Sequence, residues 1–186
     1  MITMWVKTNK PKYQGFTIVE LLIVIVVIGI LAAITIVAYN GIQQRGRDVK
    51  RKDDVAKIVH AGKLWLVNSG KLFNELGGGS SGSALGWFDS PYSPYPSVKS
   101  IFVSNGFLGE GVTDPINRKT GTIYAYMIAP CNDGDGTTRV ALAKLEIPLA
   151  ETVSQQLNGH TCTGSHFTTY TSASYGMNYA RIIDGN

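Results

Sequence analysis

The longest uninterrupted apolar stretch lies near the beginning of the chain. From Leu21 to Ala38 the sequence has 18 residues, none of them charged and only one of them Thr. A helix of that length rises by about 27 Å, close to the thickness of a bilayer's hydrocarbon core. A strand would be far shorter, and a helix satisfies its own backbone groups in lipid, so this stretch predicts a membrane-spanning helix.

A second helical pattern follows over residues 48–68. Its apolar positions recur every three or four residues, and charged positions occupy the other side, which predicts an amphipathic helix laid on a core. We expect the charge cluster "RGRDVKRKDD" to form a solvated face and Gly70 to follow the helix end. The apolar positions are Val49, Val55, Ile58, Val59, Trp65 and Leu66; the charged ones are Lys50, Arg51, Asp54, Lys57 and Lys63.

Turn-forming residues fill the next part of the chain. "GGGSSGS", residues 77–83, predicts a flexible surface loop, and three prolines within residues 87–96 predict extended or turn backbone. We expect Trp87 and Phe88 to pin this loop onto the core, the alternative being an adhesive aromatic surface.

The remaining apolar segments are short and predict strands. Between two of them stands "PCNDGDG", a segment rich in turn residues. The pattern predicts an antiparallel meander of three or four strands packed on the amphipathic helix, an α+β fold. The strand candidates are residues 101–103, 123–129, 138–147 and 176–183.

The positive charge of the chain owes much to the residues before Gly15. The formal net charge is +4, and Lys7, Lys10 and Lys12 all precede Gly15. A basic pI of this origin does not indicate nucleic-acid binding, but it favours retention of the leader on the cytoplasmic side of a membrane. A secretory signal peptide is the alternative, yet the apolar run is too long and no A-x-A site follows it.

The junction between the basic leader and the apolar run carries a specific motif. The sequence reads "KYQGFTIVELLIVIVVIGILAAI", with Gly15, Phe16, Thr17, Glu20 and Leu21 at fixed distances. This segment resembles the N-terminus of type IV pilins and of type II secretion pseudopilins, which are made as prepilins with a class III signal peptide. The resemblance implies the pilin fold: a long N-terminal α-helix, half membrane-spanning and half amphipathic, packed on a small antiparallel β-sheet.

The resemblance also implies a processing history. A prepilin peptidase would cut between Gly15 and Phe16 and methylate the new Phe16 amine. The chain would then divide into a leader peptide (residues 1–15), a hydrophobic helix that spans the membrane and forms the filament core (16–43), and a globular head (44–186). Glu20 would receive the Phe16 amine, its own or a neighbouring subunit's, during assembly. The alternative is a Glu20 that only reaches the membrane surface.

The two cysteines of the chain allow two interpretations. On an extracytoplasmic domain Cys131 and Cys162 favour a disulfide, which would fasten the C-terminal segment to a strand. Zinc bound by both cysteines with His160 and His166 is the alternative, although H-x-C-x3-H is not a dependable zinc spacing.

We predict no cofactor and no enzymatic activity. Asp133 and Asp135 in "NDGDG" are weak calcium candidates, because the distal Glu of an EF-hand is missing and a plain turn explains the residues as well. The sequence offers no nucleophile-elbow context at Ser165 and His166 and no phosphate-binding loop of the P-loop type.

The resemblance therefore implies a structural subunit of a type IV pilus, polymerised into a surface filament for adhesion, twitching motility or DNA uptake. Its expected partners are other copies of itself in a helical homopolymer, the prepilin peptidase, the pilus assembly machinery, the lipid bilayer before assembly, and a host-surface or DNA ligand. We expect a single-pass protein of the cytoplasmic (inner) membrane with an extracytoplasmic head, and later an extracellular pilus. The alternatives are a pseudopilin of a type II secretion or competence system and a membrane-anchored binding domain that never polymerises.

Overall fold

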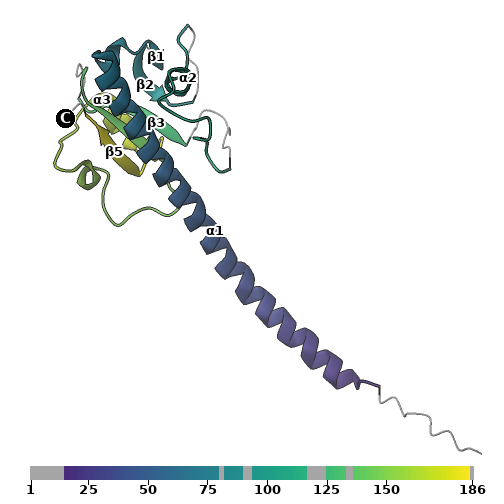
Figure 1. Ribbon diagram of the computed structural model, residues 1–186. Helices are drawn as coiled ribbons and strands as arrows, with labels where there is room; N and C mark the ends of the chain where they lie inside the picture. Colours follow the sequence, from purple (N-terminus) through teal and green to yellow (C-terminus); the bar gives the residue numbers. More distant parts are fainter. Residues whose placement is uncertain (1–14, 80–81, 90–93, 117–124, 133–135, 185–186) are drawn as a thin grey trace, which may run out of the picture. The chain divides into compact units, whose positions relative to one another are not determined.

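Figure 1 shows the computed structural model, which describes residues 15–79, 82–89, 94–116, 125–132 and 136–184. The chain forms two compact units, Met1–Ile42 and Gln43–Asn186. Helix α1 (Ile18–Ser69) contributes its first part to the first unit and its second part to the second.

The second unit is an α+β structure, as the sequence predicts. Its sheet has the order β1-β2-β3-β4-β5; the two-residue strand β1 pairs in parallel with β2, and every other pair is antiparallel. The elements are η1 (Phe73–Glu75), β1 (Gly78–Gly79), β2 (Ser83–Trp87), α2 (Val98–Ser104), β3 (Tyr126–Pro130), β4 (Arg139–Ala143), η2 (Ser154–Leu157), α3 (Ser165–Thr171) and β5 (Tyr179–Ile183).

Both faces of the sheet are covered. The sequence predicted only one covered face, the one that packs on the amphipathic helix. Alternate residues of β3 point to opposite faces: Ile128 packs with α1 residues such as Ile58, whereas Met127 packs with Phe167 of α3. All five residues of β3 and of β4 are buried. Continuous burial on two sides explains why "YMIAP" and "RVALA" lack a clear alternation of polar and apolar residues.

Three of the four strand candidates are confirmed as β3, β4 and β5, within shorter bounds. The strand predicted for residues 101–103 is wrong, because these residues belong to α2. Ser97 caps that helix by accepting a hydrogen bond from Ser100 N at 3.1 Å. Val98 and Phe102, four residues apart, are both buried on one side of it. A cap followed by an apolar pair at helical spacing outweighs the β-branched residues between them.

The flexible loop predicted for residues 77–83 is also wrong at the described strand residues, while residues 80 and 81 lie outside the described part of the chain. Gly78 and Gly79 form β1 and are buried, and Ser83 begins β2. A methyl group at Gly78 would collide with Ile101, and Gly79 has a φ of +80°. These glycines therefore permit close packing and a left-handed backbone.

Two smaller predictions are confirmed. Gly70, with a φ of +64°, follows the last residue of α1 and donates to Leu66 O at 3.0 Å, as in a helix C-terminal cap. Phe88 is completely buried beside Phe102, and Trp87 packs against the second core cluster, so both aromatic residues hold their segment on the core.

Candidate functional site

The first turn of α1 holds the Glu20 carboxylate in a closed set of hydrogen bonds. The backbone N–H and the hydroxyl of Thr17 donate to Glu20 Oε2 at 2.8 and 2.7 Å. The backbone N–H of Glu20 donates back to Thr17 Oγ1 at 3.2 Å. This is a capping box, which satisfies backbone donors that a helix N-terminus otherwise leaves unpaired. Glu20 is therefore part of the signal that starts the helix at Ile18.

Gly15 and Phe16 lie in non-helical backbone just before this cap. Phe16 is 84% exposed, and a methyl group added at Gly15 would meet no atom within 4 Å. Exposed, irregular backbone is where proteases cut most readily. Cleavage between these residues, methylation of Phe16 and its pairing with Glu20 stay predictions, since the nitrogen of Phe16 is still an amide in this uncut chain.

The apolar part of α1 is fully exposed within its own unit. Every large apolar side chain between residues 18 and 37 is at least 48% exposed. Among the described residues, α1 is the helix long and apolar enough to cross a membrane, with a window of mean hydropathy 3.3 of which none is buried. So much uncovered apolar surface indicates a lipid or protein environment that covers it.

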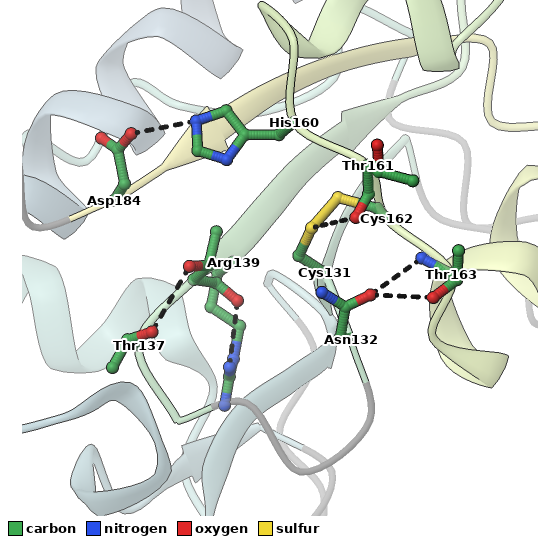
Figure 2. The surroundings of a disulfide bond; sticks show 10 residues. Cys131, Asn132, Thr137, Arg139, His160, Thr161, Cys162, Thr163 and Asp184 are labelled. Atoms are coloured by element: carbon green, nitrogen blue, oxygen red, sulfur yellow. Dashed lines mark hydrogen bonds and ion pairs between the residues drawn. A yellow bond between two sulfur atoms is a disulfide. The ribbon is translucent and has the colours of Figure 1, made fainter.

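Cys131 and Cys162 form a disulfide with a Cα–Cα distance of 4.5 Å (Figure 2). The zinc interpretation is therefore wrong, because both sulfur ligands are consumed. His160 instead faces Asp184 with 3.5 Å between Nε2 and Oδ2, and His166 packs edge-on against Tyr170.

The disulfide closes a segment with a sequence separation of 31. A loop of this length lowers the entropy of the unfolded chain enough to stabilise the fold by about 3–4 kcal/mol. Asn132 reinforces the closure, since its Oδ1 accepts from the N–H and the hydroxyl of Thr163 at 3.0 Å each (Figure 2). The C-terminal segment is thereby fastened to the end of β3, as the sequence predicts.

The calcium candidates Asp133 and Asp135 lie outside the described residues. Within the described ranges no group of three or more His, Cys, Asp or Glu residues is arranged to hold a metal ion.

A buried ionic cluster, which the sequence analysis missed, joins α1 to two loops of the second unit. We call it the Arg51 cluster; its members are Arg47, Asp48, Arg51, Asp114 and Glu146. The Arg51 side chain is 1% exposed, and its Nε donates to Asp114 Oδ1 at 2.8 Å. Its NH1 group donates to Asp48 Oδ1 and to Glu146 Oε1 at 3.0 Å each. One guanidinium thus satisfies three carboxylates, two of them far away in sequence.

The other members complete this cluster with two-point contacts. Arg47 donates to both oxygens of Glu146 at 2.7 Å. Asp48 accepts the backbone N–H groups of Glu146 and Ile147, one on each oxygen, at 2.8 Å. The segment after β4 is therefore held on α1 by both side-chain and backbone hydrogen bonds.

A second buried carboxylate lies one turn further along α1. Asp54 is fully buried, forms an ion pair with Lys50, and accepts a hydrogen bond from the Tyr126 hydroxyl at 2.7 Å. Burial, with the carboxylate of Asp54 next to it, raises the pKa of the Tyr126 hydroxyl. This contact fixes the beginning of β3 on the helix.

The solvated face predicted from "RGRDVKRKDD" is therefore wrong for Asp48, Arg51 and Asp54, which are buried. The buried position predicted for Val49 is wrong too, because Val49 is 66% exposed. The sequence did contain a signal. Arg51, Val55 and Ile58 are spaced by four and three residues, so the charge belongs to the apolar stripe. A charged residue at the helical spacing of the buried apolar residues indicates a buried ion pair.

Acid should weaken the Arg51 cluster through Glu146. Hydrogen bonds from Arg47 and then Arg51, stronger than the opposing effect of burial, lower the pKa of Glu146 to about 2 from 4.5. Because the unfolded chain binds the proton more readily, this contribution to stability is complete above about pH 4.5 and is lost as the pH falls towards 2.

We expect the free energy of unfolding to fall, between about pH 6 and pH 2.5, by about 2 kcal/mol more in the natural chain than in Glu146→Gln. Urea unfolding in detergent, followed by tryptophan fluorescence, measures the difference. Parallel pH profiles of the two chains would contradict this assignment.

Comparison with known proteins identifies a family whose motif matches the N-terminal segment of the chain. Residues 10–36 match the family described as the prokaryotic N-terminal methylation motif, which covers the capping box and the predicted cleavage site.

The chain is also similar in sequence to one particular protein. The chain is 34% identical over 77 residues to the type IV major pilin protein PilA of Myxococcus xanthus (strain DK1622). The alignment covers 40% of this chain and 35% of the relative, so the chain matches about a third of the relative's length. No solved structure matches the chain significantly. The two matches support the type IV pilin family, as the resemblance predicts.

Proposed function

We propose that this protein is a structural subunit of a type IV pilus. A prepilin peptidase cuts between Gly15 and Phe16 and methylates the Phe16 amine, and the subunit then polymerises into a surface filament. The observation that carries the proposal is the combination of the Thr17–Glu20 cap with an apolar helical segment that no described residue of its own unit covers. Structural subunits of this kind need no active site.

The proposal places the chain in the cytoplasmic membrane before assembly, with its head on the extracytoplasmic side. The disulfide between Cys131 and Cys162 supports an oxidising compartment for the head. In the filament the apolar segments of neighbouring copies bundle and cover one another. The partners are then further copies of the chain, the peptidase and the assembly machinery, and the filament serves adhesion, twitching motility or DNA uptake.

Electron microscopy of material sheared from the cell surface, with mass spectrometry of its main subunit, tests this function. We expect long filaments whose subunit begins at N-methylated Phe16. A chain that keeps residues 1–15 and enters no filament would overturn the proposal. Processed subunits found only in short assemblies that stay inside the cell envelope would favour a pseudopilin instead.

A further inference from the structure

The second unit has a cationic hollow on one flank of α1. Its volume is about 260 Å³, and it is lined by Arg45, Asp48, Val49, Lys52 and Ile147. Arg45 is exposed and makes no hydrogen bond or ion pair with any described residue. Lys52 lies over the ring of Tyr179 at 5.8 Å and forms no ion pair within the described ranges. The carboxylate of Asp48 is already used by Arg51 and by backbone N–H groups.

The floor of this hollow is apolar and open to solvent. Val49 is 66% exposed and Ile147 is 40% exposed. Neither cation has a carboxylate partner among the described residues. Two such cations beside an apolar surface suit a carboxylate on a short aliphatic stem, because the stem covers the apolar surface while the charge meets the cations. Glutamate has this shape.

Glu110 presents such a side chain on the other flank of α1. It is exposed in a turn between Gly109 and Gly111, and its carboxylate has no partner in the described part of the chain. Methyl groups added at the two glycines would meet nothing within 4 Å, so there is open space on either side of Glu110.

The two flanks are identified by neighbouring lysines. Residues two apart on a helix point about 200° apart, in nearly opposite directions. Lys50 donates to Gly111 O at 3.2 Å, whereas Lys52 lies over Tyr179 of β5. The helix therefore stands between Glu110 and the hollow of the same chain. Complementary patches on opposite flanks make a heterologous contact, which repeats from copy to copy.

We propose that Glu110 of one copy binds between Arg45 and Lys52 of the next copy, and that this contact orders the heads in the assembled filament. The inference rests on the proposed function, since it requires polymerisation. Glu151 is another exposed carboxylate without a described partner, but it follows Ile147 in the segment that lines the hollow. Glu110, on the other flank of the helix, is better placed than Glu151 to join one copy to the next.

Charge reversal in the full-length chain, in cells that assemble it, tests this contact. Like charges placed opposite each other cost enough that Arg45→Glu and Glu110→Arg should each lower the yield of sheared filaments at least about tenfold. The chain carrying both changes should recover much of that yield, because Arg and Glu then face each other in reversed order. Glu151→Arg and Lys71→Glu serve as matched controls and should leave the yield unchanged.

The outcomes separate this inference from the proposed function. If the natural chain forms filaments and either reversal leaves their yield unchanged, the contact is wrong and the proposed function stands. Another outcome is that Arg45→Glu lowers the yield, Glu110→Arg alone does not, and the chain with both changes yields no more than Arg45→Glu. The hollow then binds another anion, such as a lipid phosphate, and the inference is overturned. If the natural chain forms no filament, the proposed function fails first. Equal cellular amounts of each chain, with the disulfide formed, establish that the variants fold.

Discussion

Replacing Arg51 with methionine will lower the free energy of unfolding of the second unit by about 3–5 kcal/mol. The side chain is 1% exposed and holds Asp48, Asp114 and Glu146 through its guanidinium. Methionine fills much of the same volume but offers no donor, so each of the three buried carboxylates loses its contact with a buried cation. Arg47 keeps its ion pair with Glu146, but that pair does not replace the contacts of Arg51 with Asp48 and Asp114.

Lys57→Met is the matched control for this variant. Lys57 forms an ion pair with Asp53 at 2.6 Å on the same helix, but both side chains are about half exposed. Such an exposed pair contributes little to stability, so this variant should unfold nearly as the natural chain does. Urea unfolding monitored by tryptophan fluorescence measures both. An Arg51→Met chain no less stable than Lys57→Met would show that the cluster adds nothing to stability.

The deficit of Arg51→Met should also shrink in acid. Protonating the carboxylates removes the repulsion that the missing guanidinium leaves behind, so the variant gains relative to the natural chain as the pH falls. A cavity left by poor packing of the methionine would not respond to pH. The pH profile therefore distinguishes a lost charge contact from lost packing.

The elements predicted most reliably were those with one uniform pattern. The apolar run within α1 follows from residue types alone, and so does the end of the helix just before Gly70. Strands β3, β4 and β5 were found from β-branched and aromatic residues between turns, although their burial on two faces hid the alternation. Helix α2 was missed because its residues favour strands locally, and the Ser97 cap with the packing of Phe102 decides otherwise.

The candidate site also has a part that local sequence predicts and a part that only the fold brings together. Gly15, Phe16 and Glu20 are recognisable because their spacing is local, and the cap from Thr17 is legible in the order T-x-x-E. The Arg51 cluster brings α1 together with Asp114 and Glu146, 63 and 95 residues away. Helical spacing places Arg51 on the buried side, but only the fold supplies the partners that make its burial favourable.

If the chain polymerises as proposed, we expect Glu20 to be the position at which assembly is most sensitive to substitution. Glu20→Val should leave the chain in the membrane, because removing a carboxylate from a span lowers the cost of insertion, which is about 2.5–3.5 kcal/mol for a charge at its centre. We nevertheless expect filament yield to fall at least about tenfold, since the new Phe16 amine would enter the apolar bundle without a counter-charge. Quantitative blots of sheared and cell-bound chain measure both effects.

Two further variants separate the charge of Glu20 from its part in the capping box. Glu20→Gln keeps an acceptor for the Thr17 N–H, since glutamine also serves in a capping box, but it removes the charge. Thr17→Val removes the hydroxyl contacts at a cost of about 1 kcal/mol and leaves the carboxylate. If pairing with the amine drives assembly, Glu20→Gln loses filaments as Glu20→Val does, and Thr17→Val retains most of them. The reverse order would assign the role of Glu20 to the start of the helix and contradict the pairing.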